Sequence, residues 1–203
     1  MRVAEGWRTL RFVPDMPRKD RQMHHGAVYG PFESIDVTLH WLREVRLAVG
    51  DGVRLGLDYH HMLSPAKAAY FCRRADDLHI LSHKEPIRCE SPAAYQGLRQ
   101  MASIPFAIDE EFSSKWDFAP YVEKDLTNYA RADLCIAGGL TEAKKIAATC
   151  EVHYIDVLPH NPWGRSARRR PSTSTRQSRI LPCRSTTFQP LSSRAICFPC
   201  SQN

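Results

Sequence analysis

Long apolar runs are absent from this sequence of 203 residues, in which no stretch of 18 consecutive apolar residues occurs. That absence excludes an ordinary membrane-spanning helix. The N-terminus, MRVAEGWRTLRF, has neither the apolar centre nor the cleavage site of a signal peptide. The hydrophobic content of 43% is that of a globular protein. We therefore expect a cytoplasmic protein that does not bind a membrane.

Glycine-rich loops and paired cysteines are scarce as well. No glycine-rich phosphate-binding motif follows any apolar run, which weakens the case for a dinucleotide-binding domain. The seven cysteines are odd in number and scattered, as reduced buried thiols are. A single Cys197-x-x-Cys200 pair, without a second pair nearby, is weak evidence for zinc.

Acidic residues are missing from residues 165–203, which contain eight arginines. The overall net charge is +6, whereas residues 1–164 contain 20 basic and 22 acidic residues. The segment also has 12 serines or threonines, four prolines and no apolar period, so we expect a disordered tail. An arginine-rich arm that binds nucleic acid is one interpretation. A product of a reading-frame shift is the other, and we favour it over nucleic-acid binding because the composition changes within one residue of Gly164.

Residues 1–164 alternate short apolar runs with polar helical stretches, which predicts a parallel α/β sheet. Ser64-Pro65 and Ser91-Pro92 each place a hydroxyl at a helix N-cap and proline at the first helical position. Six such strands fit either an open doubly wound sheet or most of a (β/α)8 barrel. The expected strands are TLRFVP, VRLGLD, HILSHKEP, IPFAIDEE, ADLCIAGG and HYIDVLPH.

Ionisable residues recur at the expected strand ends, 26, 26, 23 and 27 residues apart: Asp58, Lys84, Glu110, Asp133 and His160. In a barrel all strand carboxyl ends converge on one mouth, so these side chains would meet around one ligand. We therefore predict a partial (β/α)8 barrel of about strands two to seven. Carboxylates there suit a hard cation such as Mg²⁺, and imidazoles supply acid and base groups. Together they would assist removal of a proton next to a substrate carboxylate.

Five motifs, in order and spacing, resemble the catalytic barrel of the enolase superfamily, and within it the acid-sugar dehydratases of the mandelate racemase type. The resemblance covers roughly residues 7–164. Its motifs are Asp58-x-His60, Glu85-Pro86, IDEEFSSKWDF around Glu110, AGGLTEAKKIA from Ala137, and PHNPWG from Pro159.

The resemblance implies roles for individual residues. Asp58 and Glu110 would bind Mg²⁺. His160, oriented by Asp133, would remove the α-proton of a sugar acid, and His60 would protonate the departing 3-hydroxyl. The product would be a 2-keto-3-deoxy sugar acid. The position of Arg11 is one where relatives often place a basic group that binds the substrate carboxylate.

The sequence departs from the resemblance at the expected second metal ligand, which is Lys84 instead of a carboxylate. We expect Glu85 to be no substitute, because adjacent strand residues point to opposite faces. Asp109 also replaces a usual glycine. Four further histidines have no motif support and are expected at the surface or in structural roles: His61, His79, His83 and His153.

Three functions therefore stay open: a galactonate-like or mannonate-like dehydratase, a racemase or cycloisomerase of the same superfamily, and a non-catalytic fragment with a basic tail. His60 together with His160 favours the dehydratase. We expect the family's N-terminal capping domain and first barrel strand to be absent, and relatives to form homo-oligomers.

Overall fold

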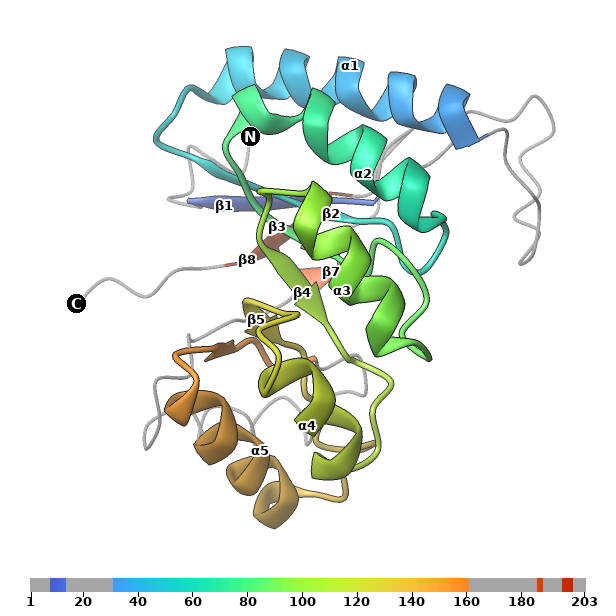
Figure 1. The fold of residues 1–203 in the computed structure, drawn as a ribbon. Coiled ribbons are helices and arrows are strands. Elements are labelled where there is room, and N and C mark those ends of the chain that lie inside the picture. Colours follow the sequence, from blue (N-terminus) through green and yellow to red (C-terminus); the bar gives the residue numbers. More distant parts are fainter. Residues whose placement is uncertain (1–7, 14–30, 161–185, 188–194, 199–203) are drawn as a thin grey trace, which may run out of the picture.

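Strands and helices alternate along the chain in the computed structural model, which describes residues 8–13, 31–160, 186–187 and 195–198 (Figure 1). The elements are β1 (Thr9–Phe12), α1 (Pro31–Val49), β2 (Arg54–Asp58), α2 (Pro65–Arg74), the 3₁₀ helix η2 (Asp76–Leu78), β3 (Ile80–Lys84), α3 (Pro92–Met101), β4 (Phe106–Ile108), α4 (Lys115–Val122), β5 (Tyr129–Ala130), α5 (Leu140–Val152), β6 (Asp156–Val157), β7 (Thr186–Thr187) and β8 (Ala195–Phe198).

The helices begin at residues that satisfy free backbone N–H groups. Ser64 accepts a hydrogen bond from the backbone of Lys67 at the start of α2, and Ser91 accepts one from Ala94 at the start of α3. Both helices begin at proline, as the sequence predicts. Helix α5 begins after Gly138 and Gly139, whose φ angles of 83° and 91° suit glycine.

The sheet confirms the partial barrel. Its strand order is β6-β5-β4-β3-β2-β1-β8-β7, and β1 to β6 are parallel. Each strand from β1 to β5 pairs with the next strand along the chain. A doubly wound sheet would reverse its strand order at a switch point, whereas a barrel does not. The described residues therefore form six consecutive parallel strands of an open barrel, joined by helices α1 to α5.

Two short strands come from the segment that the sequence predicts as a disordered tail. β8 pairs antiparallel with β1, with Thr9 opposite Phe198, and β7 pairs with β8. The sequence predicts no strand in this region, and the structure differs from it at these residues. The rest of the tail, and the boundary at Gly164, lie outside the described residues.

Apolar side chains fill the space between the sheet and the helices. Leu55 and Leu57 of β2 are fully buried in a cluster with α1 residues such as Leu39, while a second cluster joins α4 and α5 to β5 and β6. Alternate strand residues point to the other face of the sheet, so Asp58 lies away from this core. None of the described helices is long and apolar enough to cross a membrane.

One histidine belongs to the core. His83 is fully buried, and its ring packs against the rings of Tyr59, Phe71 and Phe106. Burial lowers the pKa of His83 to about 3, so the imidazole is neutral. This confirms the structural role expected for His83.

Candidate active site

The carboxyl ends of β2, β3 and β4 bring three predicted site residues together. Asp58 is the last residue of β2, Lys84 the last of β3, and Glu110 follows β4 by two residues. Backbone hydrogen bonds continue the pairing past the strands: Tyr59 N donates to Lys84 O, and Glu85 N donates to Ala107 O. The convergence predicted from their spacing is therefore present.

The ammonium of Lys84 lies among carboxylates. Its Nζ is 3.1 Å from Asp58 Oδ1, 2.9 Å from Glu85 Oε2 and 2.8 Å from Glu110 Oε2. The Lys84 side chain is only 3% exposed. An ammonium has three N–H donors, and three carboxylate oxygens lie within reach of them.

The side chain of Glu85 points into the interior, so the sequence-based expectation that it would leave the interior is wrong. Its φ angle is 42°, in the left-handed region, so the strand alternation ends at Lys84. The carboxylate turns inward and is completely buried, where Oε1 accepts a hydrogen bond from Glu110 N at 3.1 Å. Burial alone would raise the pKa of Glu85, but His61 and Lys84 lower it to about 2.

His61 is part of the same network, although no sequence motif supports it. Its Nε2 lies 3.1 Å from Glu85 Oε2, and its side chain is 15% exposed. Burial disfavours the charged imidazole, but contacts with Cys89 and Glu85 outweigh it and raise the pKa of His61 to about 11. His61 therefore pairs with Glu85 at the edge of the interior, and of the two roles expected for it, surface or structural, the structural one fits.

Glu110 is the residue on which the imidazoles converge. Its Oε1 lies 3.1 Å from His60 Nε2, and its Oε2 lies 3.3 Å from His160 Nε2 and 3.6 Å from Arg131 Nη2. Burial would raise the pKa of Glu110, but the His60 hydrogen bond and the charges of Lys84 and Arg131 hold it well below its usual range. The hydrogen bond to Glu110 also raises the pKa of His60.

His160 and Asp133 form the predicted pair. His160 Nδ1 lies 2.9 Å from Asp133 Oδ2, and a parallel bridge joins the two backbones beyond β5 and β6. Asp133 is almost fully buried, and its Oδ1 accepts a hydrogen bond from Cys135 N at 2.7 Å. A carboxylate at Nδ1 fixes the ring orientation and leaves Nε2 toward the mouth.

Arg11 lies in the interior on β1, on the side of the sheet that faces the site. Its Nη1 is 3.6 Å from Asp58 Oδ2, and its side chain is 10% exposed. The guanidinium therefore contacts a predicted metal ligand, at the position where a basic group for the substrate carboxylate was expected.

Asp109 adds strain to the loop before Glu110. It has a φ angle of 92°, a conformation that favours glycine, and both carboxylate oxygens are buried without a hydrogen-bond partner among the described residues. Burial, together with the charge of Glu85, raises the pKa of Asp109 well above its usual value. The glycine expected from the resemblance would fit this backbone better.

The donor set at the predicted metal site does not fit Mg²⁺. An ion bound by Asp58 and Glu110 would lie between their carboxylates, where Lys84 Nζ already lies within 3.1 Å of both. Mg²⁺ requires oxygen ligands at close range and is repelled by an ammonium at that distance. Ligand atoms of His60, His61 and Glu85 also lie within 4.8 Å of one another, but Lys84 contacts Glu85 as well.

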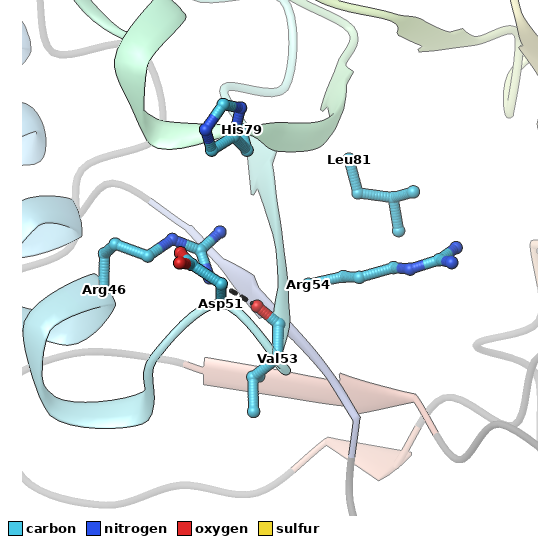
Figure 2. A pocket seen from close by; sticks show the side chains of 6 residues that line it. All are labelled: Arg46, Asp51, Val53, Arg54, His79 and Leu81. Carbon is cyan, nitrogen blue, oxygen red and sulfur yellow. Dashed lines mark hydrogen bonds between the residues drawn. The ribbon is translucent and has the colours of Figure 1, made fainter.

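A separate hollow of about 310 Å³ lies at the opposite, amino ends of β2 and β3 (Figure 2). Arg46 reaches into it from α1 and donates hydrogen bonds to the backbone oxygens of Gly50, Val53 and Leu78. These bonds tie α1 to the chain before β2 and β3. At this end of a barrel such contacts serve stability, so the hollow is not the candidate active site.

Sequence reasoning missed Glu85, His61 and Arg131 as members of the site. Arg131 lies two residues before Asp133, and period-two spacing places both on one face of the chain, which was a usable signal. Glu85 and His61 gave no such signal, because both have left-handed backbone conformations that strand alternation does not predict.

Comparisons with known proteins agree with this fold. A D-mannonate dehydratase from Caulobacter sp. (strain K31) is 34% identical over 173 residues, which cover 77% of this chain and 43% of that protein. A mandelate racemase/muconate lactonizing enzyme from Sulfitobacter sp. is 28% identical with a TM-score of 0.68, covering 78% of this chain and 39% of the other. An enolase superfamily member from Salmonella Typhimurium has 24% identity and a TM-score of 0.75, covering 81% of this chain and 43% of the other.

The chain thus spans less than half the length of these relatives. Residues 1–179 match the family of enolase C-terminal domain-like proteins, which is most of the sequence. Together with the six-strand partial barrel and the cluster at its carboxyl ends, this match shows that the chain belongs to the enolase C-terminal domain-like family.

Proposed function

We propose that this chain carries the acid–base centre of a sugar-acid dehydratase. The observation that carries the proposal is the His160–Asp133 pair, with 2.9 Å between Nδ1 and Oδ2 and an almost fully buried carboxylate. Similarity to a D-mannonate dehydratase supports a sugar acid as the class of substrate.

In this proposal His160 is the base. Asp133 holds the imidazole and stabilises the charged ring that forms when Nε2 takes the proton from the carbon next to the substrate carboxylate. Nε2 is the ring nitrogen that faces the carboxylate cluster, at 3.3 Å from Glu110. A proton acceptor at this position lies where the strand ends converge.

His60 is the acid on the opposite side of Glu110. Its side chain is 56% exposed, so it borders the open mouth, and its raised pKa favours the protonated form. It donates a proton to the 3-hydroxyl as the C–O bond breaks, and water leaves. The resulting enol becomes a 2-keto-3-deoxy acid, so the reaction removes one water and changes no oxidation balance.

The resemblance also implies Mg²⁺ at Asp58 and Glu110. Because Lys84 contacts both carboxylates, we assign no step of this reaction to Mg²⁺. Besides the histidines, Lys84, Arg131 and Arg11 bring positive charge near the proposed reaction path, each within 3.6 Å of a buried carboxylate. They restrain the carboxylates that surround the substrate position.

The test measures two reactions of a sugar acid at once: exchange of its C2 proton with solvent and elimination of water. Mannonate and galactonate, which the sequence does not separate, are incubated with the chain in deuterated water, and NMR follows both loss of the C2 proton signal and appearance of the keto acid. We expect both signals with the chain and neither with His160→Asn. The exposed His40 on α1 supplies the matched control His40→Asn. Equal turnover by His160→Asn would contradict the proposal, whereas exchange without elimination would indicate a racemase.

A second candidate is a non-catalytic relative. The observation that favours it is the Lys84 ammonium inside the carboxylate cluster, where the resemblance implies a metal ion. Absence of exchange in the chain, with exchange in Lys84→Glu supplied with Mg²⁺, would support this candidate.

A further inference from the structure

The carboxylates of the site surround a cation that the chain itself supplies. Lys84 Nζ lies 2.8–3.1 Å from oxygens of Asp58, Glu85 and Glu110. Nζ donates charge-assisted hydrogen bonds to Asp58 and Glu85, and its contact with Glu110 is an ion pair. All four side chains are at most 7% exposed, so water screens these contacts little.

The third carboxylate is held in place by its own contacts. Glu85 reaches the interior only because its backbone is left-handed, and such a conformation persists where surrounding contacts over-determine it. Here His61 Nε2 and the backbone N–H of Glu110 fix the two oxygens of Glu85. Lys84 is therefore surrounded by a cage of three carboxylates, Asp58, Glu85 and Glu110. Strand alternation alone would not place Glu85 in this cage.

The outer carboxylate oxygens are paired as well. Arg11 lies 3.6 Å from Asp58 Oδ2, and Arg131 lies 3.6 Å from Glu110 Oε2. A divalent ion added to this cage would meet Lys84 at close range and these guanidiniums just outside it. Repulsion between like charges is strongest where water is excluded.

We propose that Lys84 is a built-in cation that takes the place of a metal ion, so that the centre assembles its carboxylates without Mg²⁺. Removal of the ammonium then leaves three buried carboxylates short of a partner, which is strongly destabilising. Replacement of Lys84 by a carboxylate leaves an oxygen-rich cage that a divalent ion fills. This inference concerns metal binding and stability, and it does not rest on the proposed reaction.

The experiment compares thermal unfolding of the chain, Lys84→Met and Lys84→Glu, each with EDTA and with millimolar Mg²⁺. We expect the melting temperature of the chain to be the same in both conditions. Lys84→Met is expected to melt roughly 10 °C lower in both, from the loss of a buried ion-pair partner. Lys84→Glu is expected to melt low in EDTA and to rise with Mg²⁺. The exposed Lys124 supplies the control Lys124→Met, for which no change is expected.

Mn²⁺ binding, followed by its paramagnetic resonance signal, keeps the test decisive if Lys84→Met does not fold. The chain itself should leave the signal of free Mn²⁺ unchanged, and Lys84→Glu should reduce it. Stabilisation of the unaltered chain by Mg²⁺, or its binding of Mn²⁺, would overturn the proposal. So would a Lys84→Met variant as stable as the chain, or a folded Lys84→Glu variant that binds no Mn²⁺. None of these readouts involves a sugar acid, so failure of the dehydratase proposal leaves the result intact.

Discussion

Lys84 and Glu85 are consecutive in the sequence, yet their side chains meet in one buried ion pair with 2.9 Å between Nζ and Oε2. In an extended strand the two would point to opposite faces. The left-handed backbone at Glu85 brings both into the interior. A cation and its counter-ion thus come from neighbouring positions at the end of one strand.

Glu85→Gln should destabilise the fold by about 3–5 kcal/mol, because Lys84 and His61 would each lose a buried charged partner. Urea unfolding at pH 7 measures the change. Since the pKa of Glu85 is lowered to about 2 from 4.5, its stabilising effect is present above pH 4.5 and is lost as the pH falls toward 2. Glu90→Gln, which removes an exposed partner of Arg88, is the control and should leave stability unchanged. Equal effects of both variants would contradict the buried network.

His61 should stabilise the protein less as the solution becomes alkaline. Its pKa is raised from 6.5 to about 11, so the charged form contributes fully below pH 6.5, and the contribution is lost as the pH rises through 11. We expect the difference in unfolding free energy between the chain and His61→Gln to shrink between pH 7 and pH 10. A difference that is independent of pH in this range would argue against a charged His61.

His83 should make the fold sensitive to mild acid. Its pKa is lowered from 6.5 to about 3, so the unfolded chain binds a proton that the folded chain does not. Stability from neutral His83 is present above pH 6.5 and falls by about 1.4 kcal/mol per pH unit between about pH 6 and pH 4. His83→Phe retains ring packing against Tyr59, Phe71 and Phe106 and should remove this part of the pH dependence. An unchanged slope would mean that His83 is protonated in the folded state.

Asp109→Gly should increase stability by about 1–2 kcal/mol, because it removes a buried carboxyl without partners and relieves a left-handed backbone. The pKa of Asp109 is raised, so its folded-state cost is greatest at neutral pH and smallest in acid. Asp109→Ala separates the two effects, since it removes the carboxyl but retains a Cβ at a φ angle of 92°. Chemical denaturation should rank glycine above alanine and alanine above aspartate, and a less stable Asp109→Gly would refute this order.

Asp133→Asn should slow any C2 proton exchange of a sugar acid by about 10²–10⁴-fold, because the amide no longer favours the ring orientation and charge that His160 needs. Circular dichroism should show that the fold is retained. Asp125→Asn is a matched control, since Asp125 is exposed and its φ angle of 53° is one that asparagine tolerates. Equal exchange rates in the two variants would exclude Asp133 as the partner of the base.

The regular parts of the fold were predictable because their signals are local and periodic. The N-caps Ser64 and Ser91 mark the starts of α2 and α3, and the apolar run before Asp58 marks β2. Constant spacing between Asp58, Lys84 and Glu110 predicted that the strand ends converge, because each βα step returns the chain to the same edge. The pairing of β8 with β1 was not predictable, because residues 195–198 show no alternation of apolar and polar side chains.

The site itself was predictable only as far as the strands extend. The resemblance implied that Asp133 orients His160, and the structure places His160 Nδ1 2.9 Å from Asp133 Oδ2. Glu85 and His61 lie one or more residues past a strand, where a positive φ angle decides which way a side chain points. Strand periodicity carries no information there, so the inward turn of Glu85 and its contact with His61 became apparent only in the structure.

The antiparallel contact of β8 with β1 affects how the open barrel can be completed. Thr9 to Phe12 of β1 pair with β2 on one side and with Phe198 to Ala195 of β8 on the other, so both edges of β1 are occupied. A closed barrel of this family needs a parallel neighbour at that edge. A second polypeptide that supplied such a strand would have to displace β8 first. The chain's own tail therefore competes with any complementing fragment, and shortening the tail becomes the prerequisite for attempts to rebuild the full barrel from two pieces.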